Sequence, residues 1–334
     1  MSTTAIVQIC RYAEDHERFL ALLARAECPF ADPISFPLSA RYYKAYFGAS
    51  YRGDVSFIAH RGDDPLAVVR AQAAGELIAD NGQSIVLFRR SEAVAESALV
   101  DVLEDSARQY GAGAVKILDA TLGSALGSLG RNLLSRRAVP AVRLQAIADL
   151  TVDESVLKSG LRKSYRSLVN WGLRELRYQF VTATAFDAAA FESFRDFHIR
   201  VSGRETRSRE SWDIQAEMIK AGRAELLLSH FDGHGLVSGS LFLDTGTTTT
   251  YGVGVYERSL FDKPLAHAPL FTGMLRAKAR GQHRFVIGDV PVAKAPDDKE
   301  FSIGQFKSGF TGNLNAAIEW TFTARTETTP GQRG

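Results

Sequence analysis

The first half of the chain alternates between apolar blocks of strand length and segments with helical spacing. A short apolar stretch at residues 5–11 indicates a strand. After it, Phe19 and Leu22 share one face of a helix that begins near Asp15, a residue type that caps helix N-termini. The next segment, DPISFPLS, is turn-like, and residues 38–47 are expected to form a short helix.

Three apolar runs follow, VSFIAH, LAVVRAQAA and SIVLFRR, and the turn-forming segments RGDDP and DNGQ separate them. This pattern predicts an antiparallel meander. A helix is expected over residues 91–110 and ends near Gly111, because glycine favours the left-handed conformation that terminates helices. The run AVKILDA then has the composition of a buried strand.

The second half repeats this order of elements. RYQFVTAT predicts a strand, Asp187 is placed to cap a helix, and a second helix is expected over residues 211–221. AELLLSHF, LVSGSLFLD and TTTYGVGVY predict another meander, followed by a helix at residues 265–280 and the strand RFVIGD. The repeated order indicates that one structural unit is present twice.

A self-alignment at an offset of 170 residues supports the repeat, since it places Gly111 on Gly281 and Asp119 on Asp289. The identities are few, so the order of elements is the stronger sign of duplication, and two unrelated α/β domains remain the alternative. We predict two tandem α/β units at residues 1–150 and 151–325, each with a mixed sheet flanked by helices, and a disordered tail at 326–334.

The connection between the halves carries a concentration of positive charge. A strand, VRLQAIADL, is followed by a helix predicted over residues 153–171, in which Lys158, Arg162 and Arg166 recur every four residues and share one face. Between residues 155 and 210 there are 11 Lys and Arg residues against 6 Asp and Glu residues. Such an excess attracts phosphate groups, although a solvated helix face is the alternative interpretation.

Composition restricts the class of protein. The chain has 334 residues, a formal net charge of +2 and 45% hydrophobic residues, which is ordinary for a globular protein. Its two cysteines, Cys10 and Cys28, cannot form a disulfide framework, and the N-terminus lacks the apolar core of a signal peptide. No apolar run is long enough to span a membrane. We therefore expect a cytoplasmic protein.

Several familiar active-site motifs are absent. The sequence contains no HExxH motif, no GxSxG elbow and no GxxxxGK[ST] loop. His230 and His234 flank the turn FDGHG, so a role in the turn is favoured over metal binding, and no metal site is predicted. The glycine-rich stretch GSALGSLGR is read as a helix start or a linker, with an anion-binding loop as the alternative.

Four segments in the second half resemble the Fem family of aminoacyltransferases, which are built from two GNAT-type (acetyltransferase-fold) units. They are the basic segment LRKSYRSLVNWGLREL, a strand with Tyr251 and Gly252 before a helix containing Pro269, the sequence ARGQHRFVIGD, and the closing FKSGFTG. The resemblance covers the C-terminal half well and the N-terminal half mainly by topology. It implies two tandem GNAT-type units and an acyl or aminoacyl transfer reaction.

In this family an activated acyl group, typically an aminoacyl ester on tRNA, is attacked by an amine, and peptidoglycan precursors are the usual acceptors. The resemblance places the family's closing lysine at Lys307, where its charge serves phosphate binding or the transition state. A fixed cation lowers the barrier because attack on an ester carbonyl builds negative charge on oxygen. Asp289 is a second candidate, either holding a catalytic amine or capping the following loop.

Further residues are candidates for substrate binding, each with an ordinary structural role as the alternative. They are Phe306, Tyr251 and Tyr256 around the acceptor, and the basic residues Lys158, Arg162, Lys163, Arg166, Arg204 and Arg207 for donor or acceptor phosphates. The chain lacks the long helical arm of the well-known peptidoglycan enzymes. It also lacks the [QR]xxGx[GA] loop with which ordinary GNAT enzymes bind the pyrophosphate of acetyl-CoA.

Three functions therefore remain open. The first is aminoacyl-tRNA-dependent transfer to a small-molecule or lipid-linked amine, such as a cell-wall precursor. The second is acyl-CoA-dependent N-acylation in the synthesis of cell-surface polysaccharides or amino sugars. The third is a non-catalytic module that binds RNA or a protein partner. No permanently bound cofactor is expected, aminoacyl-tRNA or acyl-CoA would be a co-substrate, and DNA is not expected as a partner.

Overall fold

A computed structural model describes residues 7–119, 126–292 and 299–324, and the chain in it forms two compact units. Unit 1 comprises residues 1–28, 47–142 and 317–334, and unit 2 comprises residues 29–46 and 143–316. The single boundary predicted at residue 150 differs from this division. Residues 29–46 belong to unit 2 and residues 317–334 to unit 1, because tertiary contacts and not chain order decide which unit a segment joins. The predicted disordered tail lies outside the described residues.

Unit 1 has a mixed sheet whose main strands follow the order β1-β3-β4-β7-β8-β15. The pairs from β1 to β7 are antiparallel, β7 and β8 are parallel, and β15 is antiparallel to β8. Its elements are β1 (Gln8–Arg11), α1 (His16–Ala26), β2 (Tyr51–Asp54), β3 (Phe57–Arg61), β4 (Asp64–Val69), β5 (Gln72–Ala74), β6 (Leu77–Ala79), β7 (Ile85–Arg89), α3 (Glu96–Tyr110), β8 (Ala114–Asp119), α4 (Ser128–Ser135) and most of β15 (Leu314–Thr323).

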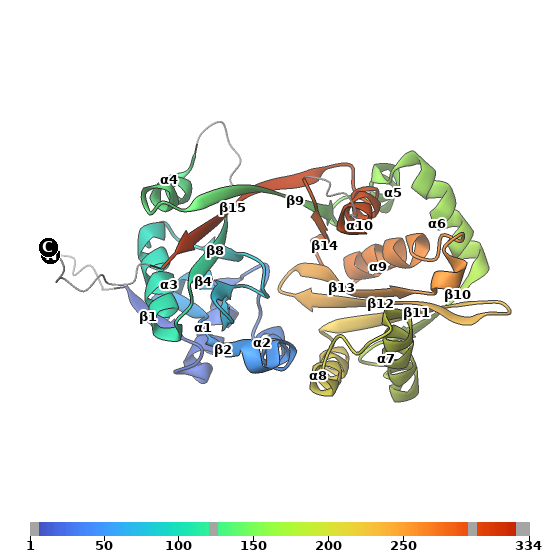
Figure 1. Ribbon diagram of the computed structural model, residues 1–334, viewed down its shortest axis with the longest axis horizontal. Coiled ribbons are helices and arrows are strands. Elements are labelled where there is room, and N and C mark those ends of the chain that lie inside the picture. The colour runs from blue at the N-terminus through green and yellow to red at the C-terminus, as the bar shows by residue number, and fades with distance from the viewer. Residues whose placement is uncertain (1–6, 120–125, 293–298, 325–334) are drawn as a thin grey trace, which may run out of the picture. The chain divides into compact units, whose positions relative to one another are not determined.

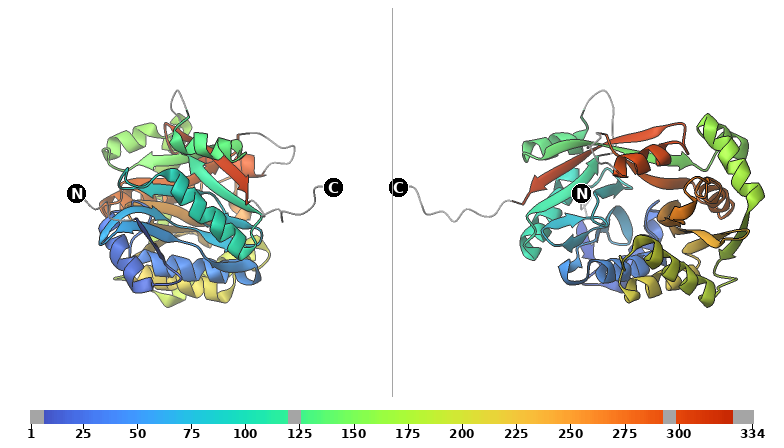
Figure 2. Two further views of the ribbon diagram at one scale, coloured as in Figure 1. Left: turned by 90° about the vertical axis from the view of Figure 1, so that its left-hand side faces the viewer. Right: turned by 45° about the vertical axis from the view of Figure 1, so that its right-hand side comes forward.

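Helices cover both faces of this sheet. Alternation along β3 directs Phe57 and Ala59 toward a core that includes Leu99 and Leu103 of α3, while α1 packs against β3 and β4. The left view of Figure 2 shows the turquoise α3 lying across the strands. Asp15 caps α1 through a 2.9 Å bond from the amide of Arg18, and α3 ends at Gly111 in the left-handed conformation. The predicted cap, helix end and meander are thus confirmed.

Unit 2 has the same kind of sheet, in the order β10-β11-β12-β13-β14-β9. The pairs from β10 to β13 are antiparallel, β13 and β14 are parallel, and β9 is antiparallel to β14. Its elements are α2 (Ser35–Phe47), most of β9 (Val139–Asp149), α5 (Glu154–Gly160), α6 (Lys163–Glu175), β10 (Leu176–Val181), α7 (Ala188–Ser202), α8 (Arg209–Lys220), β11 (Ala224–Phe231), β12 (Gly235–Thr245), β13 (Thr248–Tyr256), α9 (His267–Ala279), β14 (Arg284–Val290) and α10 (Lys299–Ser308).

The sheet of unit 2 also separates two groups of helices. Figure 1 shows α9 on one face of β11, β12 and β13 and both α7 and α8 on the other. Leu226 and Leu228 face Phe194 and Trp212, whereas Leu227 and Phe242 face Phe271. Asp187 caps α7 as predicted, through a 3.0 Å bond from the amide of Ala190.

Two predicted elements differ from the structure. The segment DPISFPLS is not a simple turn, because α2 already begins at Ser35, where Asp32 accepts a 3.0 Å bond from the amide of Ser35. Pro37 lies in the first helical turn, where no backbone N–H donor is needed. The single basic helix predicted over residues 153–171 is two helices, α5 and α6, because Leu161 and Arg162 have extended backbone. Lys158 therefore does not share a helical face with Arg162 and Arg166.

Candidate functional site

Strands β13 and β14 separate from each other within unit 2. They pair only from Thr248 to Thr250 and from Arg284 to Val286. Beyond these residues β13 continues along β12 to Tyr256, and β14 continues along β9 to Val290. The pairing of β13 with β12 and the pairing of β14 with β9 each contain a bulge next to the point where β13 and β14 separate. A bulge changes the direction of a strand. The facing edges of the two strands thus hold backbone groups that are not paired with one another, and such groups are suited to bind a ligand.

Lys307 lies beside the second of these strands. Its helix, α10, packs on β14, and the side chain of Lys307 lies against the backbone of Gly288. A β-carbon at residue 288 would overlap Nζ of Lys307 and would lie 3.0 Å from its Cε. Gly288 also has φ +131°, a conformation that side-chain-bearing residues rarely adopt. Glycine at this position therefore makes room for the lysine.

The environment of Lys307 alters its acidity. Burial lowers the pKa of Lys307, because desolvation disfavours the charged amine, and the negative charge of Asp289 acts in the opposite direction. A half-buried lysine of this kind can present a positive charge that water screens weakly, or can release its proton more readily than a surface lysine. Both properties are useful where charge develops in a reaction.

Asp289 has partners of its own. Its two carboxylate oxygens accept hydrogen bonds from Arg143, at 3.1 Å from Nε and 2.6 Å from Nη2, and Gln145 donates a third at 2.9 Å. Both donors come from β9, the antiparallel neighbour of β14. These hydrogen bonds hold the carboxylate of Asp289 in place near Lys307, an arrangement that differs from the loop cap considered from the sequence. Sequence reasoning missed Arg143 and Gln145, since only the strand pairing brings them to Asp289.

The two candidate tyrosines lie on the face of the sheet that α9 covers. The hydroxyl groups of Tyr251 and Tyr256 are hydrogen-bonded to each other, and burial raises the pKa of both. Both side chains therefore stay protonated near neutral pH and can donate a hydrogen bond.

Tyr256 is also the end of a row of hydroxyl groups across four strands. In register, Tyr178 lies opposite Ser229, Ser229 opposite Ser238, and Ser238 opposite Tyr256. Both serines are fully buried, and their hydroxyls have no hydrogen-bond partner among the described residues. The polar row is unusual in a sheet interior, where hydroxyl groups normally find partners.

The N-terminus of α9 is enclosed by aromatic side chains. The ring of His267 lies 4.5 Å from that of Tyr165, 5.3 Å from that of Phe306 and 5.9 Å from that of Phe310. Burial lowers the pKa of His267 to about 4, so the ring is neutral at pH 7. Phe306, a predicted substrate-binding residue, thus belongs to an aromatic cluster. Helix N-termini commonly bind phosphate, but here the first turn is buried under these rings.

The predicted basic residues do not gather in one group. Arg162 donates to the carbonyl of Gln305 at 3.2 Å, and Arg166 donates to that of Ser159 at 2.6 Å. Lys163 is exposed on α6, and Lys158 lies on the separate helix α5. The two arginines therefore already serve the local structure, whatever else they bind.

Arg204 and Arg207 lie in the connection between α7 and α8, as predicted. Arg204 is exposed, whereas Arg207 is held among the helices of unit 2. Its Nε lies 3.3 Å from the hydroxyl of Tyr42, its Nη1 lies 3.3 Å from Nε2 of His198, and its guanidinium group stacks over Trp212. Arg207 thus joins α2, α7 and α8, and this role accounts for it better than phosphate binding.

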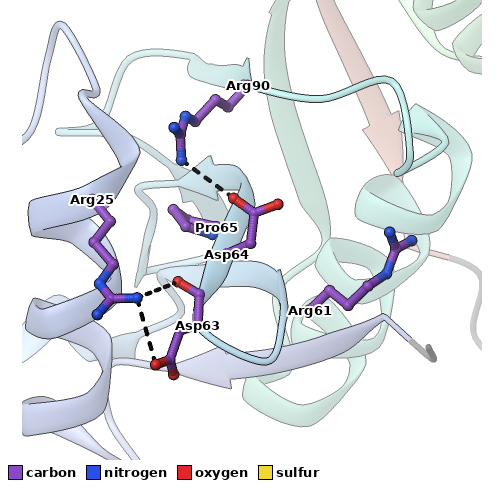
Figure 3. A pocket seen from close by; sticks show the side chains of 6 residues that line it. All are labelled: Arg25, Arg61, Asp63, Asp64, Pro65 and Arg90. Atoms are coloured by element: carbon purple, nitrogen blue, oxygen red, sulfur yellow. Dashed lines mark hydrogen bonds and ion pairs between the residues drawn. The ribbon is translucent and has the colours of Figure 1, made fainter.

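Unit 1 contains a separate surface depression with a volume of about 580 Å³ (Figure 3). Two of its three arginines are paired with its two aspartates, Arg25 with Asp63 at 3.5 Å and Arg90 with Asp64 at 3.3 Å. None of the candidate catalytic or substrate-binding residues predicted from the sequence lines it. We therefore place the candidate site at Lys307 and not in this depression.

Within residues 7–119, 126–292 and 299–324, no group of three or more His, Cys, Asp or Glu side chains is arranged to hold a metal ion. None of the helices in the same ranges is both long and apolar enough to traverse a lipid bilayer.

Comparison with known proteins gives matches in structure but not in sequence. No protein-family model and no curated protein sequence matches the chain. A crystal structure of FemX matches with a TM-score of 0.65 at 13% identity, covering 95% of this chain and 97% of FemX. L-PGS from Bacillus licheniformis matches with a TM-score of 0.56 at 14% identity, covering 92% of this chain and 91% of that one.

A tandem GNAT protein from the clavulanic acid biosynthesis pathway also matches over its whole length. Its TM-score is 0.55 at 13% identity, and the match covers 96% of this chain and 100% of that one. Identities this low establish the fold alone. The predicted fold class and resemblance are confirmed: the chain has the two-unit GNAT-type and Fem-like fold found in FemX and in this tandem GNAT protein.

Proposed function

We propose that the protein transfers an aminoacyl group from an activated ester, such as aminoacyl-tRNA, to an amine of a cell-wall precursor or small metabolite. The observation that carries the proposal is the position of Lys307, half-buried against Gly288 where β13 and β14 separate. The full-length fold match to FemX supports the same class of reaction.

In the proposed reaction the acceptor amine attacks the ester carbonyl carbon and forms a carbon–nitrogen bond. The carbonyl electrons move to oxygen, and the ammonium group of Lys307 stabilises the resulting negative charge. Cleavage of the carbon–oxygen ester bond then releases the alcohol, which takes up the proton lost by the nitrogen. No covalent enzyme intermediate is required, because holding donor and acceptor together supplies much of the rate enhancement.

The start of α9 bears on the choice of donor. An acyl-CoA donor would need a binding site for its pyrophosphate, and helix N-termini are the usual sites for such groups. Here the first turn of α9 contains Pro269, which has no N–H donor, and both Ala268 and Leu270 are fully buried. These features, together with the absent [QR]xxGx[GA] loop, favour an aminoacyl ester over a CoA thioester in unit 2.

The test compares donors and a lysine variant. Purified protein is supplied with charged tRNA or with a panel of acyl-CoAs, together with candidate amines, and product formation is followed by mass spectrometry. Lys307→Ala is expected to lower turnover about 100-fold, the usual effect of losing one group that stabilises developing charge. Lys299→Ala is the matched control, because Lys299 is exposed at the other end of the same helix.

The pH profile adds a second readout. Turnover of the wild-type protein should fall as the pH rises through the lowered pKa of Lys307, since the neutral amine no longer stabilises negative charge. Equal turnover of Lys307→Ala and wild type with a working donor would exclude this mechanism. Turnover with acyl-CoA but not with charged tRNA would instead establish the CoA-dependent reaction.

A further inference from the structure

The last turn of α10 is held by residues at the start of α6. The backbone amide of Arg162 donates to the carbonyl of Gly309 at 2.8 Å, and its Nη2 donates to the carbonyl of Gln305 at 3.2 Å. The same nitrogen lies 3.3 Å from the hydroxyl of Ser308. The hydroxyl of Tyr165 donates to the carbonyl of Phe306 at 3.2 Å. We call Arg162 and Tyr165 the α6 clamp.

The clamp adds donors to carbonyl groups at the C-terminus of α10, where Gln305 also accepts from the hydroxyl of Ser308 and Phe306 from the amide of Gly309. The last carbonyls of a helix have no N–H donor in a following helical turn, and a cation near them is favoured by the helix dipole. Arg162 is itself held, because its guanidinium group lies 5.1 Å above the ring of Tyr165. Tyr165 in turn packs so closely on Gly309 that a β-carbon there would overlap the ring.

The opposite side of α10 rests on β14 and the residue that follows it. A β-carbon at Gly304 would overlap Pro291, and the side chain of Lys307 lies against Gly288. Gly304 is the one residue of α10 that is buried. The side chain of Phe306 anchors α10 to the core of unit 2, and the polar contacts of the clamp act with it in fixing the position of the last turn.

We propose that Arg162 is a positioning residue, which holds the last turn of α10 so that Lys307 stays against Gly288. The inference rests on the proposed function, because it assigns Arg162 to the same site. It also replaces the phosphate-binding role expected for Arg162 from the sequence with a structural one. In Arg162→Ala, the carbonyl of Gln305 and the hydroxyl of Ser308 lose the guanidinium group, whereas the backbone bond to Gly309 remains. The last turn then loosens, and Lys307 moves toward water.

The experiment measures the environment of Lys307 without using activity. Full-length protein is labelled with a trace of an amine-reactive acylating reagent across a pH series, and mass spectrometry quantifies the labelled peptides. Lys299 on the same helix is the internal reference, since it is exposed. In the wild type, Lys307 should titrate below Lys299. In Arg162→Ala, its titration should shift upward toward that of Lys299.

Two further variants sharpen the test. Arg166→Ala is the matched control, because Arg166 follows one helical turn later and donates to Ser159 and Leu161 rather than to α10. It should leave the labelling of Lys307 unchanged. Arg162→Lys keeps the charge but not the planar guanidinium group, and should give an intermediate shift. If Arg162→Ala does not fold, the labelling of Lys307 in Arg162→Lys tests the proposal instead.

Turnover separates this inference from the proposed function. With Lys307 displaced, Arg162→Ala should lower kcat on the order of 10- to 100-fold, with little change in the KM of the donor. A shifted titration with unchanged kcat would support the clamp and refute the role of Lys307 in catalysis. An unchanged titration would overturn the clamp, and a salt-dependent rise in donor KM alongside it would return Arg162 to phosphate binding.

Discussion

Units 1 and 2 share a sheet topology but differ at the end of one strand. In each, a strand that leads into a long helix pairs in parallel with the strand that follows the helix, β7 with β8 and β13 with β14. Each of those later strands also has an antiparallel neighbour, β15 in unit 1 and β9 in unit 2. The repeated order supports duplication of one structural unit, so differences between the copies indicate where function has been added.

The difference concerns the aspartates that the self-alignment places together. Asp119, at the end of β8, is buried, and a β-carbon at Gly130 of α4 would lie 3.1 Å from its Oδ2. The side chain of Asp289, in β14, is 41% exposed and has Lys307 nearby. The aspartate of unit 1 is therefore shielded from solvent, whereas the aspartate of unit 2 is accessible to solvent beside the half-buried Lys307.

The helices that follow these strands are also held in different ways. In α4, Leu129 and Leu133 join the apolar core of unit 1. In α10, the fully buried residue is a glycine and Phe306 packs on the core of unit 2 while partly exposed, and polar contacts with Arg162 and Tyr165 also hold the helix. Hydrophobic burial tolerates small shifts in position, whereas hydrogen bonds depend on direction. A polar clamp therefore suits a helix that must place one side chain accurately.

The largest expected effect tests how the two helices are held. Leu133→Ala should destabilise the protein by about 2–5 kcal/mol, because it removes a fully buried side chain from the core. Ile303→Ala in α10 should change stability by no more than about 0.5 kcal/mol, because Ile303 is 40% exposed. Urea unfolding of both variants measures the two values. Similar losses at both positions would remove the contrast between α4 and α10.

The next effect concerns Gly288. Gly288→Ala should lower turnover about 100-fold, because the new β-carbon displaces Lys307. Gly281→Ala is the control, since Gly281 also has positive φ (+83°) but open space around its Cβ position. Both variants should lose about 1–3 kcal/mol of stability from backbone strain. Full turnover in Gly288→Ala would show that the position of Lys307 is unimportant.

A third prediction uses one buried ionisable group from each unit. Burial raises the pKa of Asp54 in unit 1 to about 6, so its neutral form is favoured in the folded state, and its contribution to stability is lost as the pH rises through 6. Asp54→Asn should therefore become more stable than wild type by about 1–2 kcal/mol at pH 8, but not at pH 4.

The ionisation of Lys307 should make the free energy of unfolding depend on pH with the opposite sign. Its lowered pKa means that the unfolded chain holds more protons, so wild-type stability should rise relative to Lys307→Met as the pH rises through that pKa. Unfolding free energies measured against pH for both variants check the two signs. Slopes of the same sign would contradict the assigned environments.

The smallest effect compares two buried serines. In unit 1, the hydroxyl of Ser106 accepts from Arg11 at 3.0 Å and donates to the carbonyl of Val102 at 2.8 Å. Ser106→Ala should cost about 1 kcal/mol. Ser238 of unit 2 has no partner within residues 7–119, 126–292 and 299–324, so Ser238→Ala should be nearly neutral. A larger loss for Ser238→Ala would mean that its hydroxyl binds ordered water, which a high-resolution crystal structure would detect.

Local chemistry made much of the fold predictable. Asp15 and Asp187 cap helices because their side chains reach backbone amides three residues ahead. Lys307 could be proposed from the closing motif. Gly288 could also have been found, because an isolated glycine in a strand often marks a bulge or a close approach, and here it marks both.

The rest of the site depended on contacts between distant parts of the chain. Helical spacing predicted one continuous basic helix, but the backbone is extended at Arg162, whose amide donates to Gly309. Nothing near Arg143 in the sequence indicates that it meets Asp289, 146 residues away. No local pattern records such pairings, because strand exchange and helix packing create them.

The sequence by itself determined most of the secondary structure, the repeated order of elements and the motif that contains Lys307, since capping, turn formation and apolar periodicity act over a few residues. Only the tertiary structure decided which strand completes each unit, where the basic segment breaks, and which side chains surround Lys307. Those outcomes depend on burial and hydrogen bonds between segments more than 100 residues apart, which come together only when the unit that contains them folds.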